Sequence, residues 1–141
     1  MTDVPTLTSA NVANYCVMNP LFNSPLTISS SFTGSNNNLT NGNLTVAGAS
    51  TSAQVGSIGT IGVTSGKFYF EVNVDAVSTN ANIGIINETF TGFSPSQSVN
   101  WGSESVTYRN NGQKYSGGSY SSYGSSYTTG DVIGVAVDCG G

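Results

Sequence analysis

The stretch that decides the fold is Lys67-Phe68-Tyr69-Phe70-Glu71-Val72-Asn73-Val74-Asp75. Phenylalanine and valine occupy its even-numbered positions, whereas tyrosine, glutamate and asparagine occupy the odd-numbered positions between them. Successive side chains of a β-strand point to opposite faces of a sheet, so this period of two predicts a strand with one buried face and one solvent-facing face. The rest of the chain extends this β pattern.

Downstream, two more apolar runs predict strands. Residues 82–87 carry Gly84 inside the run, and a glycine at such a place indicates a bulge or a close backbone contact. Residues 132–138 are almost continuously apolar and follow a turn at residues 129–131. A run of this kind suits a strand in the interior of a sandwich.

A hairpin is predicted between these two runs. Residues 105–109 lead into Asn110-Asn111-Gly112, whose Asn-Gly step is a strong signal for a tight turn. Residues 113–115 then return as the second strand. The following stretch, residues 116–126, consists of Ser, Gly and Tyr, and we expect it to be a long, solvent-exposed hairpin loop.

The upstream half of the chain carries weaker patterns. Residues 26–29 and 43–46 predict short strands, with a polar turn at residues 35–41. Residues 1–14 are weakly patterned, and we expect an arm that orders against a neighbour. No window shows the 3.6-residue apolar period of an amphipathic helix.

Short strands at near-regular spacing, with turn signals between them, predict an all-β chain that folds as an antiparallel β-sandwich. Residues 26–141 would form the sandwich. Residues 1–25 would form an N-terminal arm or lead-in strand.

Composition limits the partners. Only 7% of the 141 residues are charged, and the net charge is −4. The three basic residues, Lys67, Arg109 and Lys114, are too few and too scattered for the cationic patch that nucleic acid or an anionic membrane requires. No run approaches the roughly 20 apolar residues of a membrane-spanning helix, and the N-terminus has no secretory signal pattern. We therefore expect neither nucleic-acid binding nor membrane binding.

The two cysteines, Cys16 and Cys139, leave two alternatives. Either both are free, buried thiols, or a disulfide joins them in an oxidising environment. Two thiolates in a chain without histidine make a poor zinc site. Calcium needs a cluster of oxygen ligands, whereas Asp131 and Asp138 are isolated, and we expect Asp131 to cap the turn after Gly130. No metal or cofactor is expected.

Catalytic arrangements are missing as well. The absence of histidine removes Ser-His-Asp and Cys-His sites. Glu71 and Asp75 share one face of a strand, but about 13 Å of extended chain separates them, too far for retaining glycoside hydrolysis and long for inverting hydrolysis. The glycine-rich residues 56–62 lack the lysine and the following helix of a phosphate loop, so a hairpin is expected there. The sequence predicts no enzyme.

Tyrosines are the best candidates for a contact surface. Tyr115, Tyr120 and Tyr123 stand among serines and glycines, and we expect them to be exposed. A tyrosine offers a rigid apolar face and a hydroxyl, which suits stacking on sugars or packing at protein interfaces. Antibody paratopes use the same mixture of Tyr, Ser and Gly.

Motifs in these strands resemble, in the correct order, those of SPRY domains. Residues 65–72 (SGKFYFEV), 82–85 (NIGI) and 129–138 (TGDVIGVAVD) resemble three of its strands, and the last of these is the strongest match. Trp101 and Tyr108 are similar to its central segment. The resemblance implies a bent β-sandwich of concanavalin-like topology that serves as a recognition surface, with Trp101 and Tyr108 in the core.

The upstream segments are similar to a particular branch of this family. Residues 15–21 (YCVMNPL) and 39–45 (LTNGNLT) resemble the lead-in of SPRY-like segments in tailed-bacteriophage virion proteins. The family normally continues beyond the strand at residues 132–138 into closing strands, which this sequence lacks. We expect a sandwich that is incomplete at its C-terminus, with three explanations: a fragment, which is favoured, a processed chain, or strands supplied by a neighbouring subunit.

The resemblance and the composition together predict a non-enzymatic structural or recognition module of a tailed-phage virion, in a tail, fibre or capsid-decorating protein. It would act through contacts with other virion subunits, as a homo-oligomer. The alternative is a lectin-like, carbohydrate-binding module that recognises the host surface, a glycan or a protein, through Tyr115, Tyr120 and Tyr123. An intracellular SPRY adaptor that binds peptides and an enzyme acting on polysaccharide are two further alternatives.

Overall fold

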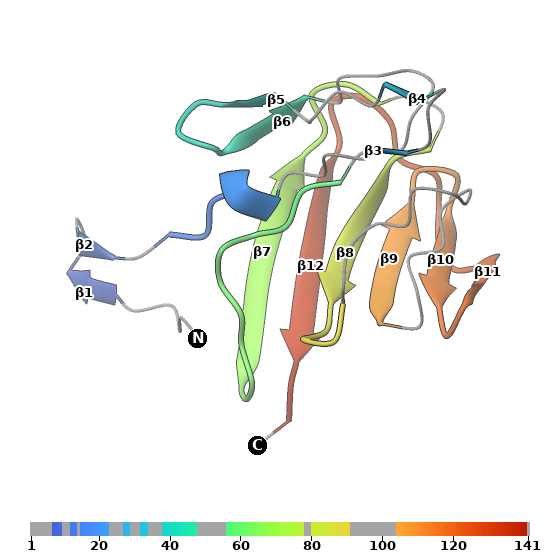
Figure 1. The fold of residues 1–141 in the computed structure, drawn as a ribbon. Helices are drawn as coiled ribbons and strands as arrows, with labels where there is room; N and C mark the ends of the chain where they lie inside the picture. Colours follow the sequence, from blue (N-terminus) through green and yellow to red (C-terminus); the bar gives the residue numbers. More distant parts are fainter. Residues whose placement is uncertain are drawn as a thin grey trace. The chain divides into compact units, whose positions relative to one another are not determined.

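The computed structural model describes residues 7–9, 12–13, 15–22, 27–28, 32–33, 38–47, 56–77, 80–90 and 104–140. In chain order its elements are β1 (Leu7–Ser9), β2 (Val12–Ala13), the 3-10 helix η1 (Pro20–Phe22), β3 (Thr27–Ile28), β4 (Phe32–Thr33), β5 (Asn38–Thr40), β6 (Thr45–Ala47), β7 (Lys67–Asn73), β8 (Asn82–Ile86), β9 (Ser105–Arg109), β10 (Gln113–Ser116), β11 (Ser119–Ser122) and β12 (Val132–Asp138) (Figure 1).

These ranges are nearly all β, the strands pair antiparallel, and no α-helix occurs in them. This confirms the predicted fold class. No helix in the described ranges is long and apolar enough to cross a membrane.

The chain divides into two compact units. The first comprises Met1–Ser65 and Gly92–Val99, and the second comprises Gly66–Thr91 and Asn100–Gly141. The second unit holds all strands from β7 to β12. The predicted domain boundary near residue 25 stays a prediction.

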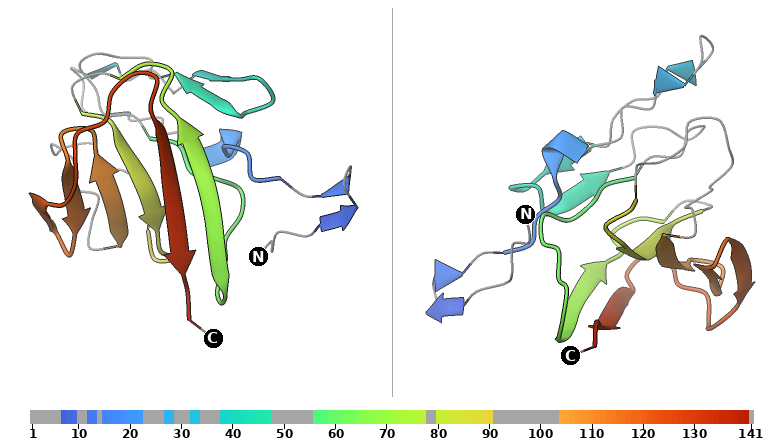
Figure 2. Two further views of the ribbon diagram at one scale, coloured as in Figure 1. Left: turned by 180° about the vertical axis from the view of Figure 1, so that it is seen from behind. Right: turned by 60° about the horizontal axis from the view of Figure 1, so that its bottom comes forward.

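In the second unit, β7 and β12 pair antiparallel along their full length and lie side by side in the views of Figures 1 and 2. Their register gathers the two phenylalanines and the valine of β7 on one face, together with the isoleucine and the two valines at odd-numbered positions of β12. Val74, just past β7, is buried, but Phe70 is 38% exposed. The expectation of a buried face is therefore wrong at Phe70. A sheet of two strands leaves each strand at an edge, where a side chain has fewer neighbours.

The other sheet of this unit has four strands in the order β11-β10-β9-β8. Gly84 in β8 lies opposite Thr107 in β9. A side-chain carbon at Gly84 would come within 2.7 Å of the Thr107 Cα and would also clash with the carbonyl oxygen of Val106. The predicted close backbone contact at this glycine is confirmed.

The hairpin from β9 to β10 confirms the prediction made from the Asn-Gly step. Gly112 ends the connecting loop with a φ of +86°, and its N–H donates to the carbonyl oxygen of Arg109 at 2.9 Å. A left-handed residue at the end of a three-residue loop lets the second strand return in register, and glycine adopts that conformation without strain.

The long loop expected at residues 116–126 is wrong in its first half, because Ser119–Ser122 forms β11. Gly117 and Gly118 have φ values of +59° and +87° and connect Ser116 to its partner Ser119. Two consecutive left-handed residues make the tight turn whose twist matches that of a hairpin. The Gly-Gly step thus extends the sheet by one strand.

The turn before β12 follows the prediction. Gly130 has a φ of +94°, and the Asp131 carboxylate accepts a hydrogen bond from the Thr128 N–H at 2.7 Å. The Asp131 N–H in turn donates to the Thr128 carbonyl oxygen at 3.2 Å. The expected cap by Asp131 is confirmed.

In the first unit, β5 and β6 form a hairpin. Its turn lies at residues 41–44, where Asn41, Gly42 and Asn43 all have positive φ. The polar turn expected at residues 35–41 is therefore wrong over Asn38–Thr40, which is strand. Asn and Gly tolerate the left-handed region better than other residues, and their position decides where the chain reverses.

The hairpin expected at residues 56–62 is also wrong. This segment forms an isolated antiparallel bridge between Gly59 and Met18. The Asn19 N–H donates to Ile58 O at 2.7 Å, and the Thr60 N–H donates to Val17 O at 2.8 Å. The glycine-rich segment therefore pairs with residues far upstream instead of with itself.

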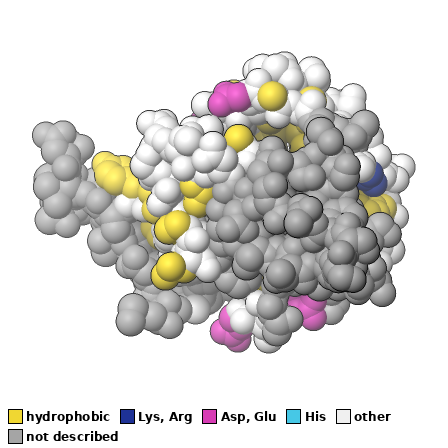
Figure 3. All heavy atoms as spheres, turned by 45° about the horizontal axis from the view of Figure 1, so that its top comes forward, with side chains coloured by type: hydrophobic (Ala, Val, Ile, Leu, Met, Phe, Trp, Pro, Cys, Tyr) yellow, Lys and Arg dark blue, Asp and Glu magenta, His cyan; other side chains and the backbone are white. Residues whose placement is uncertain are grey.

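The remaining upstream expectations fall on short elements. The strand expected at residues 26–29 is present as β3, paired with β4, and the expected arm contains the paired strands β1 and β2. Cys16 and Cys139 are free, as one alternative held, but both are exposed. Their expected burial is wrong, because Cys16 lies between elements and Cys139 lies past the end of β12. On the face in Figure 3, the visible acidic side chains (magenta) stand apart from one another.

Candidate functional site

Five of the tyrosines of the second unit form two ring clusters at the four-stranded sheet. Tyr115 in β10 and Tyr120 in β11 are directly paired, and their ring centroids lie 5.0 Å apart in an edge-to-face arrangement. Tyr108 in β9 contacts Tyr123 at 5.4 Å and Tyr127 at 5.3 Å between centroids. Separations of this size are typical of favourable aromatic pairs.

Tyr115 is buried, with 3% of its surface exposed, so the expectation of an exposed contact residue is wrong for it. Its register explains the burial. Tyr115 lies between Tyr120 on one side and Thr107 on the other, and Thr107 is itself 4% exposed. A side chain on an inner strand, with neighbours on both flanking strands, cannot reach a partner molecule.

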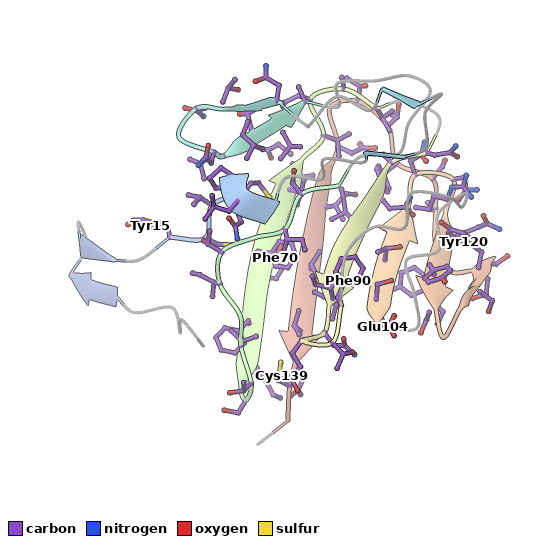
Figure 4. All side chains as sticks on the ribbon, viewed as in Figure 1. Tyr15, Phe70, Phe90, Glu104, Tyr120 and Cys139 are labelled. Carbon is purple, nitrogen blue, oxygen red and sulfur yellow. The ribbon has the colours of Figure 1, made fainter. Side chains whose placement is uncertain are left out.

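Tyr120 is half-buried, so it meets the expectation only in part. It lies on the outermost strand of its sheet, as Figure 4 shows. The guanidinium carbon of Arg109 lies 5.0 Å from the centroid of the Tyr120 ring, within cation–π range. The Tyr120 hydroxyl is buried and has no hydrogen-bond partner within the described ranges.

Tyr123 is 66% exposed, as predicted, and it is also held in place. The Lys114 ammonium lies 5.4 Å from its ring centroid, and the edge contact with Tyr108 supports it from the sheet. The N–H groups of Tyr123 and Gly124 both donate to the carbonyl oxygen of Gly112, at 3.1 and 3.0 Å. The loop after β11 is thus fixed onto the turn between β9 and β10.

Tyr127, a buried residue, also holds the loop that follows β11. It is 5% exposed, and its hydroxyl donates to the Ala81 carbonyl oxygen at 2.8 Å. Burial, with a smaller contribution from nearby Tyr108, raises the pKa of Tyr127 to about 12. Tyr108 is half-buried and its hydroxyl donates to Ser125 O, so its expected core position holds in part. Trp101, the other residue expected in the core, lies outside the described residues.

The strands that hold these tyrosines coincide with a known domain. A sequence model described as SPRY domain matches residues 67–141, which is more than half of the chain. This chain belongs to the SPRY family. Comparisons with curated proteins and with solved structures gave no match. The SPRY domain here begins with β7 and includes every strand to β12, and its antiparallel sheets are consistent with the concanavalin-like β-sandwich of the family.

The SPRY domain also contains a hollow of about 340 Å³ at one end of the β7/β12 pair. Residues 73–75 and 129–132 line it, and they include the carboxylates Asp75 and Asp131. The volume is at the lower end of the range for small-ligand pockets, roughly 300–1,000 Å³. The sequence predicted a capping role for Asp131, but it did not indicate that the turn and the end of β7 line a common hollow.

Tyr69 is an exposed aromatic residue that the sequence did not single out as a contact residue. It lies on the solvent-facing side of β7, as the alternation predicted, and it is 63% exposed. Its hydroxyl donates to Glu71 Oε1 at 2.8 Å. The hydrogen bond to Glu71 is the main cause that raises the pKa of Tyr69.

In the part of the chain that the structure describes, no group of three or more His, Cys, Asp or Glu side chains could hold a metal ion. Tyr123 and Tyr69 present exposed aromatic rings. Such rings suit contact with another molecule, since a tyrosine loses little conformational entropy on binding.

Proposed function

We propose that this SPRY domain is a non-enzymatic recognition module that acts through protein–protein contacts, as a subunit of a tailed-phage virion. The observation that carries the proposal is Tyr123, an exposed ring that is fixed by Tyr108, Lys114 and the backbone of Gly112. A preorganised aromatic ring on the surface is typical of the residues that dominate binding energy at interfaces. The placement in a virion is supported by the resemblance of residues 15–21 and 39–45 to phage lead-in segments.

The contact role is tested by comparing Tyr123→Ala with Tyr15→Ala. Tyr15 has nearly the same exposure, 67%, but lies in the first unit, so it is a matched control. Sedimentation velocity over a range of concentrations measures self-association. We expect Tyr123→Ala to weaken it by about tenfold or more and Tyr15→Ala to leave it unchanged. Equal effects of the two variants, or a wild-type protein that is monomeric and does not co-sediment with purified particles, would overturn this role.

The placement in a virion has its own test. Mass spectrometry of purified particles from cells that carry the gene should detect the chain at a fixed ratio to the major capsid protein. Particles that lack the chain while the cell lysate contains it would contradict the placement.

A second candidate is a lectin-like module, because an exposed tyrosine ring such as Tyr123 can also stack on a sugar. A glycan array probed with the oligomer separates the two candidates. Binding that is lost in Tyr123→Ala and in Tyr120→Ala favours the lectin. Absence of binding in every oligomeric state favours protein contacts. For either candidate, incubation with polysaccharide should release no reducing ends.

A further inference from the structure

The solvent-facing side of the β7/β12 pair is a continuous surface of exposed side chains. The register places four cross-strand pairs on it, namely Lys67 with Asp138, Tyr69 with Ala136, Glu71 with Gly134, and Asn73 with Val132. We call these eight residues the Tyr69 face. Tyr69 is 63% and Val132 is 54% exposed, and the side chains of Lys67 and Asp138 are 84% and 61% exposed. The face is therefore open to a partner molecule.

The hydroxyl end of the Tyr69 ring lies close to Gly134 on the neighbouring strand. A side-chain carbon at Gly134 would come within 2.5 Å of the Tyr69 hydroxyl oxygen and within 3.1 Å of Cε2 and Cζ, so the glycine leaves the room that the ring occupies. The opposite residue on the neighbouring strand, Ala136, is also small. The Tyr69 side chain is 63% exposed, and an accessible tyrosine ring attracts cations through its quadrupole.

A carboxylate is fixed next to this ring. The Tyr69 hydroxyl donates to Glu71 Oε1 at 2.8 Å, which leaves the second carboxylate oxygen free of this hydrogen bond. Glu71 is exposed, and its cross-strand partner Gly134 has no side chain to cover it. A guanidinium over the ring could therefore also reach Glu71, and this combines a cation–π contact with a charge-assisted hydrogen bond.

The charge around the face is acidic. Lys67 is paired with Asp138 at 3.5 Å, so these two charges compensate each other. Glu71 lies on the face, and Asp75 and Asp131 line the hollow at its end, where Asn73 and Val132 also lie. The face and the hollow thus present three further carboxylates along one direction of β7. This charge favours a cationic partner over a phosphate, a nucleic acid or an acidic glycan.

We infer that the Tyr69 face binds a basic segment of a partner protein, with an arginine guanidinium over Tyr69 and against Glu71 and with further basic side chains toward Asp75 and Asp131. The inference rests on the proposed role in protein–protein contacts, but it uses the β7/β12 sheet, whereas Tyr123 lies in the loop after β11. A neutral sugar could stack on Tyr69 as well, yet it would gain no charge attraction from the carboxylates at the end of the face.

A synthetic peptide of alternating glycine and arginine, with both ends blocked, tests the inference on the full chain. Peptides in which serine or glutamate replaces arginine are the controls, and a neutral hexose polymer is the fourth probe. Isothermal titration should show binding of the arginine peptide and of none of the other three probes. This binding should be weaker at ~0.5 M salt than at low salt because the contact is electrostatic. Equal binding of the arginine and serine peptides, or binding of the hexose polymer alone, would overturn the inference.

Variants locate the site. Glu71→Gln keeps the size of the side chain and should weaken peptide binding by about tenfold, whereas Glu88→Gln, an exposed glutamate in the loop after β8, should not. Tyr69→Leu should also weaken binding, and Tyr69→Phe, which keeps the ring, should retain most of it. If Glu71→Gln binds as wild type does, the inference is wrong, whatever the stability of Tyr69→Leu.

The outcome is separable from that of the proposed function. Tyr123→Ala should leave binding of the arginine peptide unchanged, since Tyr123 lies in the loop after β11 and not on the β7/β12 sheet. Loss of self-association in Tyr123→Ala without any peptide binding would leave the proposed function standing and remove this inference. Peptide binding that depends on Glu71, in a chain that neither self-associates nor enters particles, would support this inference and contradict the proposed function.

Discussion

The two sheets of the SPRY domain use tyrosine in opposite ways. In the four-stranded sheet, Tyr115 is 3% exposed and Thr107 beside it is 4% exposed. In the two-stranded sheet, Tyr69 is 63% exposed although it lies in a longer strand than Tyr115 does. The number of flanking strands and the face that a residue occupies decide whether an aromatic side chain stabilises the fold or remains available for contact. The residue type alone does not.

The largest expected contrast is between Tyr115→Ala and Tyr69→Ala. Removing the buried ring leaves a cavity between β9 and β11, and such truncations typically cost about 3–5 kcal/mol in the free energy of unfolding. Removing the exposed ring should cost far less, because Tyr69 is 63% exposed and its loss opens no cavity. Urea denaturation followed by circular dichroism measures both. Similar midpoints for the two variants would contradict the assignment of Tyr115 to the core.

The glycines of the two sheets offer a second contrast. A side-chain carbon at Gly84 would meet the backbone of Val106 and Thr107, which cannot move independently, so Gly84→Ala should cost about 2 kcal/mol. At Gly134 the same carbon would meet the Tyr69 side chain, which can rotate away, so Gly134→Ala should cost less than about 1 kcal/mol. Thermal unfolding of both variants measures the two costs. A lower unfolding temperature for Gly134→Ala than for Gly84→Ala would contradict this prediction.

Alkaline pH should show that the buried Tyr127, unlike an exposed tyrosine, makes the free energy of unfolding depend on pH. Its pKa is raised from 10.0 to about 12 in the folded state, so the folded protein holds a proton that the unfolded chain releases above pH 10. Stability should therefore be fully present below about pH 10 and should fall as the pH rises toward about 12. Tyr127→Phe is expected to be less stable near neutral pH by about 1 kcal/mol, because the hydrogen bond to Ala81 is lost. Between pH 10 and 12 the free energy of unfolding should fall less steeply in Tyr127→Phe than in the wild type. An identical fall in the two proteins would exclude Tyr127 as the cause.

The smallest effect should come from the ion pair between Lys67 and Asp138. Both side chains are largely exposed and their charged atoms lie 3.5 Å apart. Pairs of this kind contribute at most about 0.5–1 kcal/mol and are screened by salt. Lys67→Gln should therefore shift the unfolding midpoint only slightly, and the shift should vanish at ~0.5 M salt. A persistent loss at high salt would indicate packing by the lysine stem.

Much of this fold could be predicted from local sequence. The strand at β7, the close contact at the glycine in β8, the Asn-Gly turn after β9 and the turn before β12 each have a cause within a few residues, and all four were confirmed. The buried face predicted for β7 was wrong at Phe70. The Gly-Gly step at Gly117 and Gly118 carried an equally local signal. It was overlooked because the serines around it lack the apolar alternation by which strands are recognised.

The candidate site could be predicted only in part, because exposure depends on partners far away in the sequence. Tyr115, Tyr120 and Tyr123 have similar local surroundings, yet they are buried, half-buried and exposed. The difference arises from the register of β10 between β9 and β11 and from the hydrogen bonds that Gly112 accepts. Tyr69 was likewise assigned to the correct face, but its contact with Gly134 depends on the pairing with β12.

The last strand of the four-stranded sheet has a practical consequence for handling this protein. β11 consists of three serines and one tyrosine and carries no charge, proline or bulge that would prevent another strand from adding to it. Concentrated samples should therefore be prone to slow aggregation with a fibril-like β signature. A lysine introduced at Ser121 should prolong their shelf life, and dye-binding assays of stored solutions would reveal the difference.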